Sequence, residues 1–310
     1  MNSLSSSQYT HVHTYTGCMA LIYPTSMKVL SSWVKEPERR REILCILLGV
    51  LCLAVALPHL IRYAIPLSDF RTLMIITSLL TLFASVLAFH ILRAGKFLSS
   101  SSISKSEKKK SKGFLWEPKF FLPTIAKCGH DWELFTFWTQ ISKYFEYTSN
   151  GDTSYAAIVA FVCIAVGMFG CLITSQVAKR VEAEHALIVI NLCSMIFVGS
   201  LGTFHQVESN KLSICIGVLI GLVVVSDSAL YSSIVIRAYS NKPSLVGDAL
   251  AAQMGISTFV AVAALYINPL LIENLGWTVG LLVTASGSAV SIVCSCLMSL
   301  RLARIRKQEM

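Results

Sequence analysis

Titratable side chains inside apolar segments are the first candidates for chemistry in this sequence. The stretch GHDWELFTFWTQ, residues 129–140, opens a strongly apolar segment and carries an imidazole and a carboxylate. His130, Glu133, Phe137 and Gln140 follow one another at steps of three, four and three, so in a helix they share one face. A carboxylate in hydrocarbon is costly unless it is paired or faces water. We therefore expect this face to point to the cavity between two halves of the protein, or to a polar partner.

Two interpretations of Glu133 follow from its position. In the first, Glu133 is a proton-coupling carboxylate, because a desolvated acid binds and releases a proton as its surroundings change. In the second, Glu133 and His130 cap the cytoplasmic end of a helix that starts near residue 130, where the helix dipole favours acids such as Asp131. The sequence alone leaves both open.

A second polar patch lies on a later apolar segment. Asp227 and Tyr231 are four residues apart and share a helix face. Asp227 lies deep in its segment, where it serves either proton coupling or a structural hydrogen bond to a neighbouring helix. Lys28, inside the first apolar segment, either pairs with an acid or an anionic substrate, or extends its ammonium group to the interface.

Composition places these residues in a membrane protein. Of the 310 residues, 54% are hydrophobic and only 14% are charged, whereas soluble domains contain about 25% charged residues. Long apolar runs recur along the chain, and their lengths match membrane-spanning helices rather than the short strands of a barrel. The predicted spans are residues 16–33, 43–64, 71–93, 130–148, 153–177, 185–204, 212–238, 246–271 and 276–302. The predicted fold is all-α, a polytopic transmembrane helical bundle with about nine spans.

Basic residues predict the orientation of this bundle. Most of the 26 Lys and Arg lie on alternate connections, and positive residues accumulate in cytoplasmic loops. This distribution accounts for the net charge of +9 without nucleic acid as a partner. The connections expected in the cytoplasm are 34–42, 94–129, 178–184, 238–245 and 302–310.

The longest of these connections separates two related parts of the chain. Pro37 and Gly49 are twelve positions apart, and so are Pro243 and Gly255, which indicates an internal repeat. The sequence predicts a partial N-terminal bundle in residues 1–93, a linker in 94–129 and a six-helix C-terminal bundle in 130–310. The Ser-rich and Lys-rich linker is either a solvated connection or a binding segment for anionic membrane lipids.

The chain resembles the major facilitator superfamily over nearly its whole length. GCMALIYPTSMKVLSSWVKEPERRREILCILLGV is similar to the family's fourth span, fourth–fifth loop and start of the fifth span. GCLITSQVAKRVEAEH takes the place of the eighth–ninth loop motif, but the acid and the loop glycine of that motif are missing. CGHDWELFTFW, VSDSALYSSIV and LVGDALAAQMG resemble the seventh span, tenth span and tenth–eleventh loop of bacterial members. By this resemblance the chain has three spans of the first half and six of the second, and lacks the first three spans.

The resemblance implies a secondary active transporter of a small solute, coupled to protons, in a bacterial inner membrane. The seventh and tenth spans line the cavity in this family, so the expected pathway residues are Glu133, Asp227, His130, Gln140, Tyr231 and Lys28. A fragment of a twelve-span protein would need a separately encoded N-terminal segment as a partner. The alternative is a membrane remnant or sensor that keeps the bundle without transporting. The sequence has no nucleotide-binding loop and no clustered His and Cys ligands, so we expect no enzyme activity, no cofactor, no metal and no disulfide.

Overall fold

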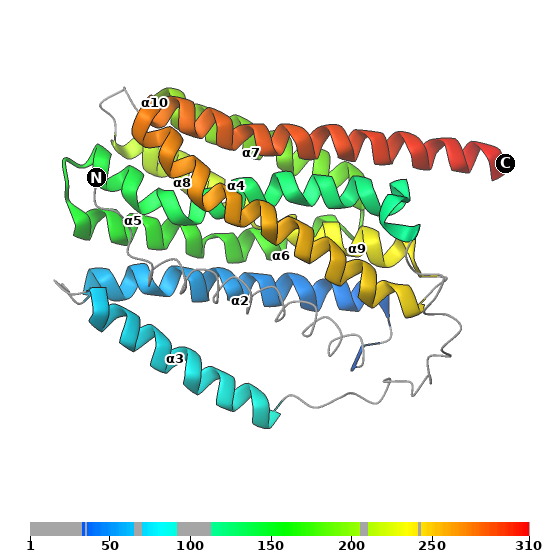
Figure 1. The fold of residues 1–310 in the computed structure, drawn as a ribbon, viewed down its shortest axis with the longest axis horizontal. Helices are drawn as coiled ribbons and strands as arrows, with labels where there is room; N and C mark the ends of the chain where they lie inside the picture. Colours follow the sequence, from blue (N-terminus) through cyan, green and yellow to red (C-terminus); the bar gives the residue numbers. More distant parts are fainter. Residues whose placement is uncertain are drawn as a thin grey trace.

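The described part of the chain is a bundle of α-helices (Figure 1). The computed structural model describes residues 33–34, 36–64, 70–91, 113–204, 210–240 and 243–309, and no strand occurs in these ranges. The helices are α2 (Pro37–Ala64), α3 (Phe70–Ile91), α4 (Pro118–Thr148), α5 (Thr153–Ala165), α6 (Gly167–Val177), α7 (Ala183–Phe204), α8 (Asn210–Val224), α9 (Ser228–Ala238) and α10 (Pro243–Glu309). The predicted all-α class is confirmed. Lys28, nearly all of the predicted span 16–33 and residues 92–112 of the linker region lie outside the described residues.

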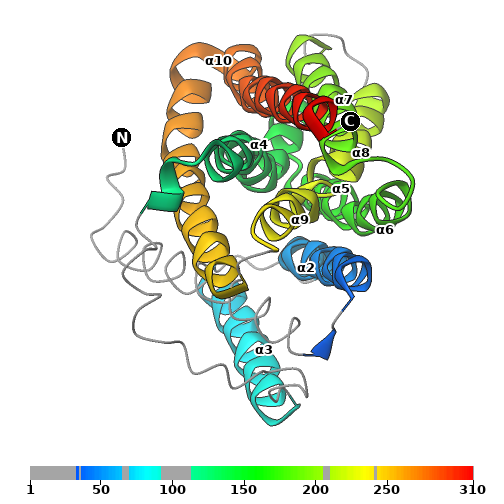
Figure 2. The ribbon, with the colours of Figure 1, turned by 90° about the vertical axis from the view of Figure 1, so that its right-hand side faces the viewer.

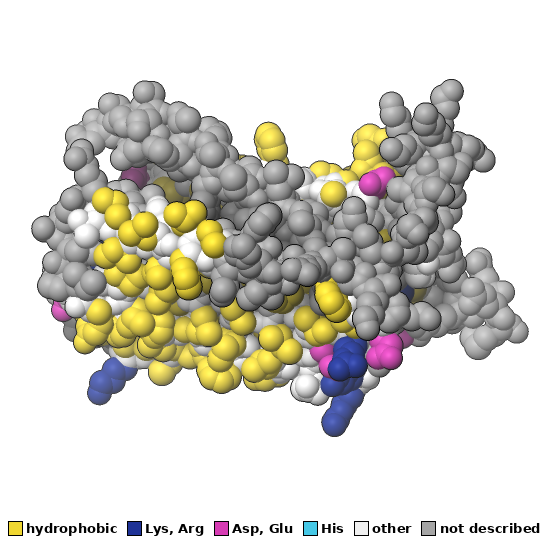
Figure 3. Space-filling view, turned by 90° about the horizontal axis from the view of Figure 1, so that it is seen from below, with side chains coloured by type: hydrophobic (Ala, Val, Ile, Leu, Met, Phe, Trp, Pro, Cys, Tyr) yellow, Lys and Arg dark blue, Asp and Glu magenta, His cyan; other side chains and the backbone are white. Residues whose placement is uncertain are grey.

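Apolar side chains cover the outside of the bundle. Among the described residues, five helices are long and apolar enough to cross a membrane. They comprise Arg41–Ala64, Thr153–Val177, Ala183–Phe204, Lys211–Ala238 and Leu245–Arg304. Phe259 is 82% exposed, whereas polar side chains such as Asn191 and Ser291 are fully buried. Hydrophobic side chains spread over the middle of the surface and charged ones gather toward its ends (Figure 3). This inverted arrangement suits a protein surrounded by lipid.

Helix α4 runs through the middle of the bundle (Figure 2). It packs mainly on α10, which also packs along α7, and it contacts α5, α8 and α9 as well. Helix α2 lies against α5 and α6, while α3 diverges from the rest of the bundle (Figures 1 and 2). The arrangement surrounds α4 with neighbours, which explains why a helix with four charged residues between Lys127 and Lys143 is stable there.

The two last predicted spans form a hairpin at Gly276. Helix α10 is continuous from Pro243 to Glu309 except at Gly276, which has a φ of 83° and a ψ of 169°. Only glycine adopts this conformation readily, so it turns the chain back on itself between the two arms (Figure 1). The predicted spans 246–271 and 276–302 correspond to these arms.

Two predicted single spans contain a short interruption of their α-helical hydrogen bonds. The segment 153–177 comprises α5 and α6 on either side of Val166, and the segment 212–238 comprises α8 and α9 on either side of residues 225–227. Val166 and Asp227 keep right-handed helical dihedral angles, so each segment remains a single span. The second interruption places Asp227 directly before the first residue of α9.

The helix that contains the predicted span 130–148 starts earlier than that span. Helix α4 begins at Pro118, which occupies the first turn, where a missing N–H costs nothing. The end of the predicted linker is also packed rather than solvated, since Phe114 and Phe120 are buried in contact with each other. Tyr239, just after α9, donates its hydroxyl proton to Glu117 Oε2 at 3.2 Å. Charged residues in this first part of α4 lower its mean hydropathy, which is why the apolar pattern starts too late.

Candidate functional site

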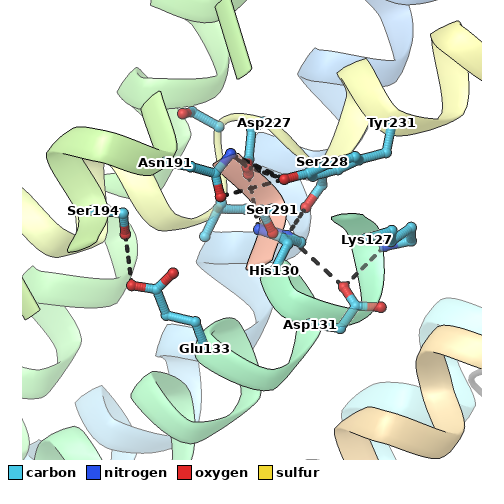
Figure 4. A network of polar contacts seen from close by, with 12 residues as sticks. Lys127, His130, Asp131, Glu133, Asn191, Ser194, Asp227, Ser228, Tyr231 and Ser291 are labelled. Atoms are coloured by element: carbon cyan, nitrogen blue, oxygen red, sulfur yellow. Dashed lines mark hydrogen bonds and ion pairs between the residues drawn. The ribbon is translucent and has the colours of Figure 1, made fainter. Parts of the chain in front are cut away.

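Asp227 is the centre of a buried polar cluster (Figure 4). It is 1% exposed, and its side chain does not cap α9. His130 Nδ1 of α4 lies 2.9 Å from Asp227 Oδ1. Asn191 Nδ2 of α7 and the Tyr231 hydroxyl of α9 each donate to Asp227 Oδ2 at 3.0 Å. The carboxyl group of Asp227 therefore joins three helices at the point where the α8–α9 span is interrupted.

His130 uses both ring nitrogens. Its Nε2 shares a hydrogen with Ser228 Oγ at 2.6 Å, and the same nitrogen lies 3.8 Å from Asp131 Oδ1. The ring packs beside the Tyr231 ring, with centroids 5.3 Å apart. His130 is thus fixed between α9 and its own helix, with an aspartate on either side.

Glu133 accepts hydrogen bonds at both carboxylate oxygens. Ser194 of α7 donates to Oε1 at 2.8 Å, and Ser288 in the second arm of α10 donates to Oε2. Glu133 is 1% exposed. Among the described residues, no lysine or arginine forms an ion pair with Glu133 or Asp227. Both acids are therefore buried at membrane depth without a permanently charged partner.

Lys127 and Asp131 form a buried ion pair next to this cluster. Lys127 Nζ lies 2.9 Å from Asp131 Oδ1, one turn apart on α4, and both side chains are 5% exposed. These residues and Glu133 lie well inside α4, which starts at Pro118. The interpretation of Glu133, His130 and Asp131 as caps of a helix end is therefore wrong, because the helix dipole acts only within the first turn.

Small residues bring α4 and α10 together at the cluster. A methyl group on Gly129 would collide with the carbonyl oxygen of Gly287, and the reverse also holds. Ser291, one turn beyond Gly287, donates to the carbonyl oxygen of Ala126 at 2.6 Å. This close approach is what brings Ser288 within reach of Glu133.

The structure separates the predicted site residues into two groups. His130, Glu133, Asp227 and Tyr231 lie together in the cluster. Gln140 is buried further along α4, beside a small hollow between α4, α7, α8 and α10, and its side chain bonds to Thr139 rather than to the cluster.

The surroundings of the cluster match one of the two expected ones. Its side chains come from α4, α7, α9 and α10. Ser194 of α7 and Ser288 of α10 are the polar partners of Glu133. In the described part of the chain, this face of α4 therefore meets polar partners on helices of the second half.

Sequence reasoning missed four hydrogen-bond partners, Asn191, Ser194, Ser228 and Ser288. A signal for three of them exists. Asn191 and Ser194 are three residues apart on one face of an otherwise apolar span. The last span carries polar residues at steps of four, three and four, namely Thr284, Ser288, Ser291 and Ser295. Polar residues at helical spacing inside an apolar span indicate a face that packs on a polar partner.

The carboxylates of the cluster are surrounded by hydroxyl, amide and imidazole groups, all of which form hydrogen bonds to acids. Among the described residues, no group of three or more His, Cys, Asp or Glu side chains lies close enough to hold a metal ion.

Comparison with known families identifies the class of protein. The family model described as Major Facilitator Superfamily matches residues 16–241, more than half of the chain. None of the curated proteins compared with the chain matches it. The chain therefore belongs to the major facilitator superfamily and is an integral, multi-pass membrane transporter, as the sequence motifs and the apolar helices indicated.

Proposed function

We propose that this chain is a secondary active transporter that couples the movement of a small solute to protons. The observation that carries the proposal is the buried pair of acids, Glu133 and Asp227, held by α7, α9 and α10. Ionisable residues inside membrane-spanning segments are costly, and they commonly belong to proton relays of transporters. The resemblance to bacterial family members supports an inner membrane as its location.

The chemistry of the two acids favours proton binding over a purely structural role. A structural hydrogen bond needs one polar partner, whereas Asp227 contacts His130, Asn191 and Tyr231 together. In a low-dielectric interior a carboxylate without a cation tends to take up a proton. A group whose surroundings change during the transport cycle then binds the proton on one side and releases it on the other.

The site lies within the helices of the second half, so coupling acts through helix packing. Protonation of Asp227 or Glu133 changes the hydrogen bonds to α7, α9 and α10 without contacting the solute directly. The solute then binds elsewhere, and the two events are linked because both depend on one conformational equilibrium.

Proton movement driven by solute tests the proposal. The 310-residue chain is reconstituted into liposomes that contain the pH indicator pyranine, and amino acids, sugars, nucleosides and organic cations are added one at a time. We expect at least one solute to move protons into the vesicles, with protein-free liposomes and the Glu146→Gln variant as controls, since Glu146 lies outside the cluster. A protein that moves no protons and accumulates no labelled solute would instead support a non-transporting remnant or sensor.

A further inference from the structure

His130 lies between two aspartates that belong to different elements (Figure 4). Asp131 follows it directly on α4 and pairs with Lys127 one turn earlier in the same helix, and Asp227 lies at the interruption between α8 and α9. His130 and Asp227 are 1% exposed and Asp131 is 4% exposed. A buried imidazole between two carboxyl groups has the arrangement of a proton relay, because each ring nitrogen can exchange a hydrogen with one acid.

Neither side of this arrangement has the alignment of a hydrogen bond, and the two sides differ in distance. Nδ1 is within contact of Asp227 Oδ1 at 2.9 Å. Nε2 is 3.8 Å from Asp131 Oδ1, which is too long for a hydrogen bond, and is bonded instead to Ser228 Oγ at 2.6 Å. Ser228 and Asp131 thus compete for the same ring nitrogen.

We infer that His130 carries protons between Asp227 and Asp131. In this state the hydrogen bond between Ser228 and Nε2 keeps the ring from transferring a proton to Asp131. The inference rests on the proposed function and deepens it, since it names the route by which the buried proton leaves toward the end of the bundle with the basic loops. Asp131 and Ser228 were not among the expected pathway residues, and neither needs to contact the solute.

The transfer balances in protons. It starts with a protonated Asp227, a neutral ring whose hydrogen is on Nε2, and an ionised Asp131. Nε2–H leaves Ser228 Oγ, approaches Asp131 and gives its proton to Oδ1, while the Asp227 proton passes to Nδ1. The products are an ionised Asp227, a neutral ring with its hydrogen on Nδ1, and a protonated Asp131, which releases its proton outward.

Charged and titratable groups surround the ring on both sides. Lys127 pairs with Asp131, so the route ends at an ion pair. The other titratable groups facing the ring are Glu133 on α4 and Asp227 and Tyr231 on α9. From α7 and α10 the cluster receives the amide of Asn191 and the hydroxyl of Ser288, which do not titrate.

Time-resolved infrared spectroscopy of the 310-residue chain tests the relay without any solute. A protonated carboxyl group has a carbonyl stretch that an ionised one lacks. The band that belongs to Asp227 is identified by its loss in Asp227→Asn. After a jump from low to high pH, the rate at which this band disappears reports the release of the Asp227 proton.

Four variants are expected to change the decay rate of the Asp227 band in opposite directions. Asp131→Asn and His130→Gln should each slow the decay at least about tenfold, because a positioned proton acceptor typically contributes that much or more. Ser228→Ala should accelerate it, because Nε2 loses the competing hydroxyl. Ser228→Ala combined with Asp131→Asn should again be slow, which a general loosening of the fold would not produce. Ser233→Ala is the matched control, since Ser233 bonds only to the carbonyl of Leu230 within α9 and should leave the rate unchanged.

The outcomes separate the relay from the proposed function. A decay that is insensitive to His130→Gln and Asp131→Asn overturns the relay and leaves Asp227 as a proton carrier. If Ser228→Ala still accelerates the decay of the band when Asp131→Asn is also present, the relay is overturned as well, because the proton then leaves by another route. If Asp227→Asn removes no carboxyl band at any pH at which the protein stays folded, Asp227 carries no proton, and the proposed function loses its main support together with the relay.

Discussion

Gly129 on α4 and Gly287 in the second arm of α10 face each other so closely that a methyl group on either would collide with the other's backbone carbonyl. The contact lies directly beside His130 on one helix and Ser288 on the other. The approach of two backbones at this point allows the Ser288 hydroxyl to reach Glu133, and the Ser291 hydroxyl to reach the Ala126 carbonyl. Helix packing and the polar cluster therefore depend on each other.

Gly287→Ala is expected to destabilise the protein by about 1–3 kcal/mol, the usual cost of overpacking a close contact. The methyl group must push α10 away from α4, because the Gly129 carbonyl is backbone and cannot turn aside. Unfolding in detergent, followed by tryptophan fluorescence, measures the change. Gly255→Ala on the same helix is the control, since nothing lies within 4 Å of its added methyl group, and an equal effect of both substitutions would contradict the packing argument.

Ser288→Ala is expected to lower the free energy of unfolding by about 1–3 kcal/mol, because Glu133 loses the hydroxyl at Oε2 and stays buried. The exposed Ser286, whose hydroxyl bonds to the carbonyl of Val283 in its own helix, provides the control variant Ser286→Ala. In a Glu133→Gln background the cost of Ser288→Ala should change, because the two residues interact directly. Additive effects within experimental error would show that the contact with Glu133 does not stabilise the fold.

Arg237→Met is expected to destabilise the protein by about 3 kcal/mol. Arg237, in the last turn of α9, pairs with Glu184 at the start of α7, and the Glu184 side chain is only 2% exposed. Removing the cation leaves a buried carboxylate without its partner. The double variant Glu184→Gln, Arg237→Met should recover most of the lost stability, as measured by thermal unfolding. A double variant as unstable as Arg237→Met alone would show that the buried charge is not the cause.

Single cysteines at Asn150 and Arg180 test the orientation. Both residues are exposed, and they lie at opposite ends of the span formed by α5 and α6. The basic loops predict that Asn150 lies outside and Arg180 in the cytoplasm. In a background with the native cysteines replaced, an impermeant thiol reagent added to cells should label Asn150→Cys and spare Arg180→Cys. The reverse pattern would invert the predicted orientation.

Periodicity predicted the faces of the helices but not the neighbours of those faces. The spacing of His130 and Glu133, and of Asp227 and Tyr231, indicated two polar patches, and the structure brings all four residues together. The patches were expected at a cavity between halves or at a polar partner, and in the described residues they meet polar partners on α7 and the second arm of α10. The helix that packs on a polar face is decided by how closely two backbones can approach, as Gly129 and Gly287 do. The periodicity of a single helix does not contain this information.

Charge patterns also limited the prediction of helix ends. Lys119 and Lys127 made the first part of α4 look like a cytoplasmic loop, because an isolated charge is disfavoured in a membrane helix. Asp131 neutralises Lys127 at 2.9 Å, and the helix continues through this pair. The interruption at residues 225–227 was hidden for a different reason, since the backbone at Asp227 keeps right-handed helical dihedral angles and the apolar pattern resumes in α9.

The coupling role of Asp227 is the central claim. Asp227→Asn keeps a side chain that can still bond to Asn191 and Tyr231, but its amide cannot carry a proton. Proteoliposomes with a pH difference of about one unit, the equivalent of about 1.4 kcal/mol per proton, permit up to about tenfold accumulation of a solute coupled to one proton. Glu133→Gln, measured in the same way, shows whether the second acid shares the coupling.

The most direct test of this coupling role uses the solute found in the pyranine screen. Its accumulation driven by a pH gradient is compared with its exchange across vesicles without a gradient. We predict that Asp227→Asn abolishes accumulation and retains exchange, because exchange needs only the conformational change and not the proton. Full accumulation by Asp227→Asn would contradict the account and make Asp227 a structural residue.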